Sequence, residues 1–291
     1  MKYTIAFRKA LSSTWREKRL WIFGGTIFFF GISGETLFNI FYSLFQNDFF
    51  TFSTIKGFQS SFSENFFQSL TSLALLGGTI FFLAIAYIIY TASLGAMVRA
   101  VTLVEQKKSI GVVSVFKAII KGKFLRLLAI SILSGLFSAL ILLLTYYASF
   151  FSLVISLFFA SVLAVILVVV LLLTKLSVAA VVIENDTLFE AIKTSFLLFK
   201  KHAADCLLLS VMIIALYAIL GIAMVVSVFA AALPFLLIAI AATLKQYVVV
   251  AWIVFMLGIL ASFVVFLIFS SAASAFSWSS WVYMYAHLRK K

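Results

Sequence analysis

Long uncharged runs alternate along the chain with short segments in which apolar and charged residues recur at helical spacing. The uncharged runs include residues 127–174, 206–244 and 246–286. Each is long enough for a membrane-crossing helix, which needs about 20 apolar residues. Their apolar residues do not alternate at every second position, as they would in the strands of a membrane β-barrel. The pattern predicts an all-α integral membrane protein with a single membrane domain over residues 1–291.

Six transmembrane helices are predicted, arranged as three hairpins. The run 127–174 is long enough for two spans, and its cluster of polar and aromatic residues at 146–152 marks the turn between them. Residues 46–69 are too charged to be buried, so they are predicted to form an outer loop between the first two spans. The predicted spans are residues 20–45, 70–98, 125–147, 152–174, 206–229 and 247–270.

A cytoplasmic amphipathic helix is predicted before each hairpin, at residues 1–19, 110–121 and 187–201. In the third, Thr187 and Glu190 have the spacing of a capping box, with Asp186 as an alternative N-cap. Such helices can lie in the membrane interface with their apolar faces among the acyl chains. The predicted apolar faces are Tyr3, Phe7, Ala10, Leu11, Thr14 and Trp15 in the first helix, Val112, Phe116, Ile119 and Ile120 in the second, and Leu188, Ile192, Phe196 and Phe199 in the third.

The recurring order of amphipathic helix and hairpin predicts a threefold structural repeat. Equivalent places hold similar short sequences, FRKAL from Phe7, FKAII from Phe116 and FEAIK from Phe189. The alternative interpretation is that the same amphipathic spacing arose three times independently.

The distribution of positive charge predicts the orientation of the chain. Its net charge is +13, with 22 Lys and Arg residues. If both termini and the connections 99–126 and 175–205 lie in the cytoplasm, only Lys56 and Lys245 fall on the other side. Basic residues beside membrane spans mark the cytoplasmic face, so both termini are predicted to be inside. This placement indicates anionic lipid rather than nucleic acid as the partner of the positive charge.

A basic rim at the level of the lipid headgroups is predicted on the cytoplasmic face. Juxtamembrane basic residues are worth about 1 kcal/mol each against an anionic leaflet. The predicted members of the rim are Lys117, Lys121, Lys123, Arg126, Arg289, Lys290 and Lys291.

Glu35 is an acidic residue within the first predicted span. A carboxylate inside a span is a candidate for proton or substrate handling. The alternative is that Glu35 lies near the outer interface and reaches water. No Lys, Arg or His occurs at a matching depth in another predicted span, which weakens the case for a proton relay.

The last third of the chain holds two predicted interruptions. Pro234 should end or kink a helix, and residues 235–243 after it are predicted to be re-entrant or interfacial. An unbroken helix over residues 247–289 would be about 60 Å long, roughly twice the hydrocarbon core. We therefore expect a kink or an interfacial tail around residues 270–280, with residues 276–291 as an amphipathic C-terminal end.

Other reactive residue types are scarce. Cys206 is the single cysteine, and His202 and His287 are the two histidines, too few for an ordinary metal site. Arg99 and Lys175 stand at predicted inner helix ends and are interpreted as interfacial anchors. No nucleophile motif, phosphate-binding loop or pair of acidic residues on one membrane helix is present. The sequence therefore predicts neither an enzyme nor a cofactor.

Three segments resemble a group of uncharacterised six-span prokaryotic membrane proteins, the superfamily of the glycerophosphodiester phosphodiesterase membrane domain and the YciC-like proteins. They are AFRKALSSTWREKRLWIFGG from Ala6, VVIENDTLFEAIKTSFLLFKKH from Val181 and WVYMYAHLRK from Trp281. The resemblance extends over the whole chain in architecture. It implies a membrane module without enzymatic residues, in the cytoplasmic (inner) membrane of a prokaryote.

Two functional hypotheses follow. The first is a non-enzymatic integral membrane protein that interacts with anionic lipid at its cytoplasmic face and acts as a scaffold or partner subunit. The second is a transporter component, whose cytoplasmic helices dock a soluble ATPase or whose spans form a solute path. Small residues such as Gly135, Gly221 and Gly258 permit close helix packing, within the chain or against a protein partner or a second copy.

Overall fold

A computed structural model describes residues 2–31, 66–148, 150 and 153–289. These residues form helices joined by short turns, with no β-strand among them. The helices are α1 (Lys2–Arg16), a short apolar helix (Arg19–Gly31), α4 (Phe66–Glu105), α5 (Val112–Gly122), α6 (Phe124–Ala148), α7 (Leu153–Ile183), α8 (Leu188–Lys201), α9 (Ala203–Leu244) and α10 (Val248–Arg289). The predicted span 20–45 lies partly outside the described residues, and Glu35 lies wholly outside them.

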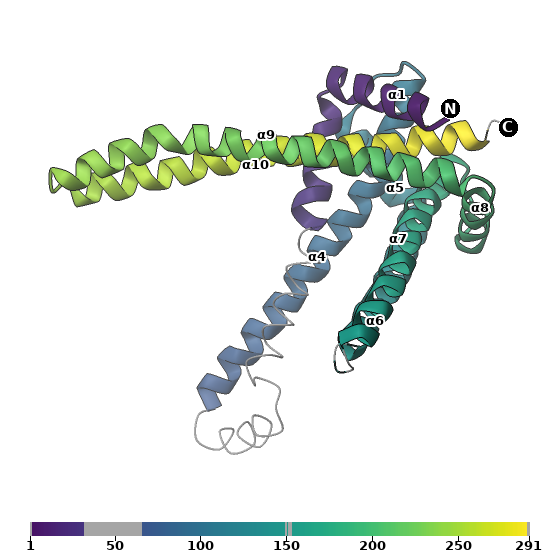
Figure 1. Cartoon of the computed structure of the whole chain (residues 1–291), viewed down its shortest axis with the longest axis horizontal. Helices are drawn as coiled ribbons and strands as arrows, with labels where there is room; N and C mark the ends of the chain where they lie inside the picture. The colour runs from purple at the N-terminus through teal and green to yellow at the C-terminus, as the bar shows by residue number, and fades with distance from the viewer. Residues whose placement is uncertain (1, 32–65, 149, 151–152, 290–291) are drawn as a thin grey trace.

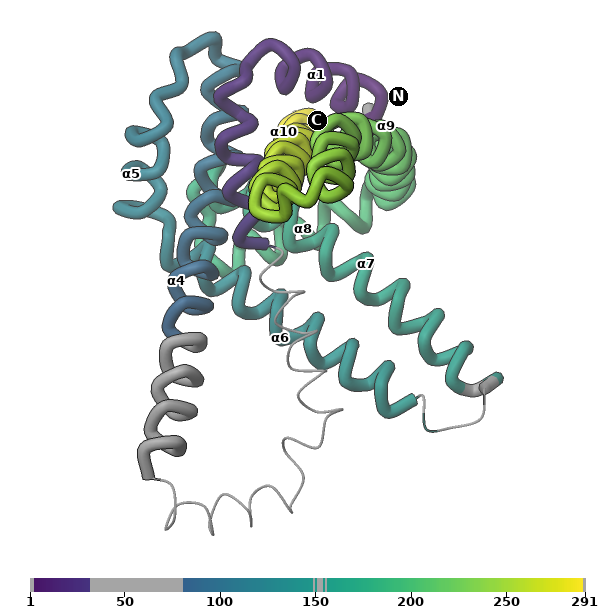
Figure 2. Tube along the Cα trace, turned by 90° about the vertical axis from the view of Figure 1, so that its left-hand side faces the viewer, coloured from purple at the N-terminus to yellow at the C-terminus, as the bar shows by residue number. Residues whose placement is uncertain are grey.

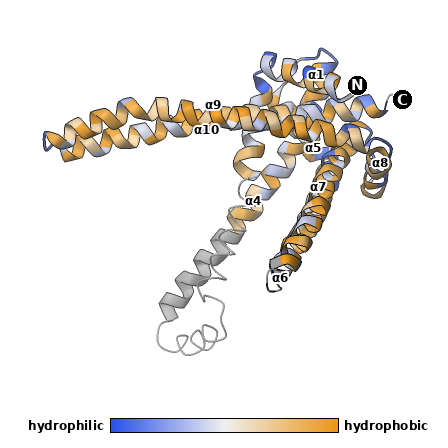
Figure 3. Ribbon diagram, in the orientation of Figure 1, coloured by the Kyte–Doolittle hydropathy of each residue, from blue (hydrophilic) through white to orange (hydrophobic). Residues whose placement is uncertain are grey.

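Five of these helices are long and apolar enough to cross a membrane: α4 over Phe81–Glu105, α6, α7 over Ser156–Ile183, α9 and α10. Large apolar side chains are exposed along most of their length, as expected for surfaces covered by lipid. In Figure 3 the α9–α10 pair is hydrophobic along its shaft and hydrophilic at its outer tip, while the other hydrophilic residues gather near α1, α5 and α8. The prediction of an all-helical, multi-pass membrane protein is confirmed at this level.

The helices meet at one end and separate toward the other (Figure 1). Helices α6 and α7 pack side by side, and so do α9 and α10. The two pairs and α4 leave the meeting point in different directions, as the views in Figures 1 and 2 both show. Helix α1 lies on α10 and α9, α5 lies against α4, and α8 lies against α7.

The meeting point holds most of the protein core, and we call it the junction. At its centre every residue of α10 from 275 to 285 is buried. Residues 176–182 of α7 and 91–98 of α4 are buried in the same way. A helix that is buried on all sides must be surrounded by other helices, and here α1, α4, α7 and α9 all pack against α10.

The short helices α1 and α8 contact the junction through narrow rows of small residues. Helix α1 buries Ala6, Ala10 and Thr14, spaced four residues apart, and α8 buries Ala191 and Ser195. Small side chains let helix backbones approach closely. The predicted apolar faces were expected to lie among acyl chains, and several of their large members are exposed rather than packed on the junction. These exposed members are Leu11, Trp15, Ile120 and Phe196.

Helix α9 continues through Pro234 to Leu244, so the predicted helix end near residue 229 and the separate segment 235–243 are wrong. Proline removes one backbone hydrogen bond. Ending the helix within lipid would leave several backbone groups unpaired, which costs more. The helix therefore runs on to a tight turn, in which the Tyr247 N–H donates to the Ala242 carbonyl at 2.9 Å.

Helix α10 is continuous from Val248 to Arg289, so the predicted alternative of an interfacial tail that begins around residues 270–280 is wrong. Residues 276–289 of the predicted amphipathic end belong to this helix and residues 276–285 are buried on every side, while residues 290 and 291 lie outside the described residues. The 42-residue helix exceeds the hydrocarbon core of a membrane by about 30 Å. Protein covers the part of this excess that lies at residues 275–285.

The helix Arg19–Gly31 crosses α10 at very close range. A side-chain carbon at Gly24 would lie 2.7 Å from the Ala275 nitrogen and would collide with the Ser271 carbonyl. At Gly25 it would lie 2.7 Å from the Ser271 hydroxyl oxygen. Two adjacent glycines thus permit this crossing, which fixes the entry of the chain into the junction.

Candidate functional site at the junction

The described members of the predicted basic rim lie on α5, at the start of α6 and at the end of α10. Lys117 and Lys121 are exposed on α5, and Lys123 and Arg126 follow at the start of α6. Arg289 ends α10 and lies near Asp186 in the α7–α8 connection. Lys290 and Lys291 lie outside the described residues.

Lys123 and Arg126 bind the carbonyl groups at and just after the C-terminus of α7. The Lys123 ammonium donates to the Val182 carbonyl at 2.6 Å. The Arg126 guanidinium donates to the Asn185 carbonyl at 2.9 Å and to the Asp186 carbonyl at 3.3 Å. The last carbonyls of a helix lack partners within it, and cations there also complement the helix dipole. The sequence prediction missed this intramolecular role.

Positive charge is concentrated at this end of the molecule. Burial, followed by repulsion from Arg99 and Arg126, lowers the pKa of Lys123. Lys117 and Lys121 carry their charges on the exposed face of the neighbouring helix α5.

Arg289 forms an ion pair within the junction. Its guanidinium lies 2.8 Å from a carboxylate oxygen of Glu184, and the Tyr285 hydroxyl donates to the other oxygen at 2.9 Å. The Glu184 side chain is largely covered. This pair joins the end of α10 to the end of α7, so the Arg289 side chain has a structural role.

The α7–α8 connection contains the predicted capping box. The backbone N–H and the hydroxyl of Thr187 both donate to the Glu190 carboxylate, at 3.0 and 2.7 Å. These two hydrogen bonds lower the pKa of Glu190. Burial raises the pKa of Asp186, and so does repulsion from Glu184 and Glu190. Thr187, not Asp186, is therefore the N-cap, and the capping-box prediction is confirmed.

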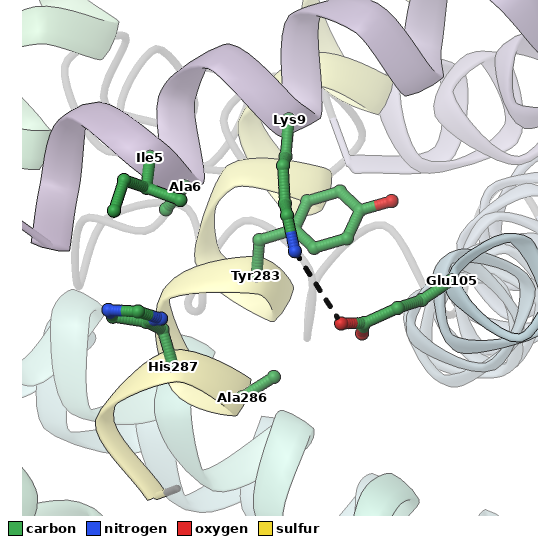
Figure 4. Close-up of a pocket in the computed structure, with 7 residues that line it drawn as sticks. All are labelled: Ile5, Ala6, Lys9, Glu105, Tyr283, Ala286 and His287. Carbon is green, nitrogen blue, oxygen red and sulfur yellow. Dashed lines mark ion pairs between the residues drawn. The ribbon is translucent and has the colours of Figure 1, made fainter. Parts of the chain in front are cut away.

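A second polar cluster links α1, α4 and α10 (Figure 4). Lys9 lies 3.9 Å from Glu105 and 5.9 Å from the centre of the Tyr283 ring. The Tyr283 hydroxyl shares a hydrogen bond of 2.7 Å with Ser13. The cavity between these residues and His287 has a volume of about 30 Å³, enough for one or two water molecules. This cluster is too small to bind an organic ligand and holds the junction together.

Trp15, Lys18 and Trp21 form an aromatic anchor at the bend after α1. The Lys18 ammonium lies 4.0 Å from each indole ring. The Trp21 indole N–H donates to the Thr14 carbonyl at 2.8 Å, while Trp15 is 69% exposed. Trp side chains favour the membrane–water interface, because they combine an apolar ring with a polar N–H group.

The outer faces of α5 and α8 and the start of α6 carry large exposed apolar side chains. Val113, Leu125 and Phe189 are 79%, 77% and 82% exposed. Exposed lysines lie close by in sequence, Lys117 and Lys121 on α5 and Lys193 on α8. Apolar side chains beside lysines are typical of helices that lie in an anionic membrane surface.

Lys175 is not the interfacial anchor that the sequence predicted. It lies within α7, where its ammonium is 3.4 Å from the Ser277 hydroxyl of α10. The rings of Trp278 and Trp281 lie 5.9 and 5.6 Å from it. The sequence signal was the uncharged stretch 176–183, which shows that the helix continues for two more turns beyond Lys175.

The remaining chemistry-bearing residues do not form a reactive cluster within the described part of the chain. No three His, Cys, Asp or Glu side chains among the described residues gather where they could hold a metal ion. Cys206 is buried at the start of α9, and His202 lies 3.9 Å from Asp205. The arrangement is best suited to binding negatively charged groups next to apolar surface.

Comparisons with protein families, with curated proteins and with solved structures gave no match to this chain. The resemblance to the phosphodiesterase membrane-domain superfamily therefore stays a prediction.

Proposed function

We propose that the chain is a non-enzymatic protein of the cytoplasmic membrane of a prokaryote, and that its junction binds anionic lipids of the inner leaflet. In this proposal six spans form three hairpins, both termini lie inside, and α1, α5 and α8 rest in the inner interface. The charge distribution supports this orientation. Apart from Lys245 at the far turn of the α9–α10 pair, the described Lys and Arg residues belong to the junction end.

The observation that carries the proposal is the double-faced character of the three short helices. Each packs on the junction with one face and leaves large apolar side chains exposed on another, such as Trp15, Val113 and Phe189. Lysines stand beside these exposed side chains. An anionic lipid can contact both kinds of side chain, because its acyl chains cover the apolar groups and its headgroup binds the lysines.

The lipid-bound junction would act as a scaffold for a partner protein or a second copy. The ion pairs and close contacts that join α1, α4, α7 and α10 support this role, because they fix the short helices relative to one another. A rigid platform at a membrane surface loses little conformational freedom when a partner binds.

The test compares the effect of removing the exposed lysines of α5 with the effect of removing the basic residues that bind carbonyls at the end of α7. Native mass spectrometry in mixed zwitterionic and phosphatidylglycerol lipid would compare the wild type with the double variants Lys117→Gln/Lys121→Gln and Lys123→Gln/Arg126→Gln. The first variant should retain less phosphatidylglycerol at unchanged thermal stability. The second should lose stability, by about 1 kcal/mol for each hydrogen-bonding side chain, because carbonyls at the end of α7 lose their donors.

Lys245→Gln, at the opposite end of the α9–α10 pair, is the matched control and should change neither property. Full retention of phosphatidylglycerol by Lys117→Gln/Lys121→Gln would contradict the proposed function.

A further inference from the structure

A largely apolar cavity of about 250 Å³, with several hydroxyl groups and Lys175 in its wall, lies where α4 and the α6–α7 pair leave the junction. Figures 1 and 2 show these helices separating below this point. Tyr87 and Tyr90 of α4, Ser131 and Ser134 of α6 and Thr174 of α7 contribute hydroxyl groups to its wall. Hydroxyl groups on membrane-spanning helices can form hydrogen bonds with polar groups between the helices.

Lys175 lies in the wall of this cavity on the side of α10. It is deeply surrounded by protein atoms and keeps some accessible surface, because it borders the cavity. Its one hydrogen bond goes to Ser277 at 3.4 Å, and no described carboxylate forms an ion pair with it. The rings of Trp278 and Trp281 stabilise the ammonium only in part. A charge in such surroundings is costly without a counter-charge.

Ser131 borders the same cavity. Its hydroxyl is buried and interacts with the Tyr87 phenol, but it does not form a hydrogen bond of full geometry. Buried hydroxyls in folded proteins are nearly always paired. The neighbouring pair is satisfied, since the Thr174 hydroxyl donates to the Val170 carbonyl at 2.8 Å and shares a hydrogen bond of 2.7 Å with the Ser134 hydroxyl. A ligand oxygen in the cavity would accept a hydrogen bond from the Ser131 hydroxyl.

We propose that this cavity binds the negatively charged phosphate headgroup of an anionic membrane lipid. Its phosphate oxygens accept hydrogen bonds from the Lys175 ammonium and the Ser131 hydroxyl. The cavity is large enough for a phosphate group but not for a whole lipid, so the acyl chains leave between α4 and α6. Both helices carry exposed apolar side chains that acyl chains can cover, such as Phe81 on α4 and Leu136 on α6. Charge complementarity and this apolar route favour a lipid over a soluble anion.

The depth of Lys175 is consistent with a headgroup. It precedes Ile183, the last residue of α7, by about 12 Å along the helix axis. With the junction in the inner interface, this position falls near the boundary between headgroups and acyl chains. The inference rests on the proposed membrane placement but does not depend on the exposed lysines of α5.

The experiment uses the full chain in neutral detergent and follows phosphatidylglycerol and phosphatidylcholine binding by native mass spectrometry. The wild type should retain one phosphatidylglycerol more firmly than the rest, and no phosphatidylcholine in the same way. Lys175→Met should weaken that site by about 10- to 100-fold, the range expected for a hydrogen bond to a charged group. Ser131→Ala should weaken it less, and Lys117→Gln should leave it unchanged.

Gly135→Val provides a second variant that keeps every charge. A side-chain carbon at Gly135 meets only the Tyr87 hydroxyl, at 3.9 Å, so a larger side chain fills the cavity without colliding with the backbone. Loss of the firmly held lipid in this variant supports the cavity as its site. Unchanged retention in folded Lys175→Met or Gly135→Val overturns the proposal.

Competition with inorganic phosphate distinguishes the two sources of a phosphate group. A lipid that resists displacement supports the proposal, whereas displacement at millimolar phosphate assigns the cavity to the free ion and overturns the lipid assignment. Loss of lipid from Lys117→Gln/Lys121→Gln alone bears on the proposed function and leaves this site unaffected.

Discussion

The outer and inner parts of α10 belong to one unbroken helix and have very different surroundings. In the outer part, Val249 and Trp252 are 73% and 59% exposed, and α9 is the neighbouring helix. In the inner part, Trp281 is 1% exposed and Tyr285 is fully buried. Both parts are uncharged between residues 248 and 286, so hydropathy does not separate them. Lipid covers one part in the proposed placement, and protein covers the other.

The two parts differ in the kind of residue they use. The outer part is rich in Val, Ile, Leu and Phe, whereas the inner part combines Ser277, Ser279 and Ser280 with large aromatic side chains. Small hydroxyl residues let other helices approach, as where the Thr14 hydroxyl lies 3.4 Å from that of Ser279. Apolar surface gains little by moving from lipid to protein, so close packing must supply the stability. The stability of this protein should therefore be concentrated at the junction.

The largest effect is expected from truncating a tryptophan of the inner part. Trp281→Ala leaves a cavity among fully packed neighbours and should cost about 3–5 kcal/mol. Trp252→Ala removes an exposed ring from the outer part and should cost less than about 1 kcal/mol. Unfolding of both variants in mixed micelles of increasing denaturing detergent measures the difference. Equal losses would show that the two parts of α10 contribute alike.

A smaller effect is expected at the crossing of the helix Arg19–Gly31 over α10. Gly24→Ala forces a methyl group against the Ser271 carbonyl and should cost about 1–3 kcal/mol. Gly221→Ala on α9 is the matched control, because nothing lies within 4 Å of the added carbon. It should be neutral or slightly stabilising, since alanine is the better helix former. Thermal unfolding of the two variants tests this, and a stable Gly24→Ala protein would mean that the crossing is loose.

The smallest effect concerns the first turn of α8, where the Glu190 carboxylate is exposed. The folded-state pKa of Glu190 is lowered by its hydrogen bonds from Thr187. Its contribution is therefore present above the ordinary carboxyl pKa and is lost as the pH falls through the folded-state pKa. Amide hydrogen exchange in the first turn of α8 should accelerate as the pH is lowered, once the intrinsic pH dependence is subtracted.

Thr187→Ala should accelerate this exchange at neutral pH and flatten its pH dependence, whereas Thr187→Ser, which keeps the hydroxyl, should resemble the wild type. The same profile in Thr187→Ala and the wild type would mean that the capping box does not stabilise α8.

Hydrophobic runs were sufficient to predict the helical, multi-pass class, and local spacing was sufficient for the capping box at Thr187 and Glu190. They did not predict the course of α9 beyond Pro234 or of α10 beyond residue 270. The length of an uncharged run indicates only that the segment is shielded from water. It does not indicate whether lipid or protein shields it. The burial of Lys175 was missed for the same reason, because a single charge at the edge of a run looks like an anchor.

The faces by which the short helices pack on protein could not be predicted from periodicity. Periodicity gives most weight to large apolar residues, and it assigned Leu11, Ile120 and Phe196 to faces that lie among acyl chains; the structure leaves all three exposed. Contact between helices favours small residues, and the structure places Ala10 and Ala191 at the junction. A helix at a membrane surface has two apolar contacts to make, one with protein and one with lipid, and a single hydrophobic face cannot represent both.

The position of the core segment in the chain sets an order for assembly. Residues 275–288 lie at the centre of the junction, yet they are synthesised after every other helix described here. The earlier helices must enter the membrane before the segment that joins them exists. Their inner ends, including the buried stretches of α4 and α7, therefore remain without their main contact until translation has passed α10. During that interval the nascent protein depends on lipid, or on a membrane chaperone, to cover surfaces that the finished protein buries.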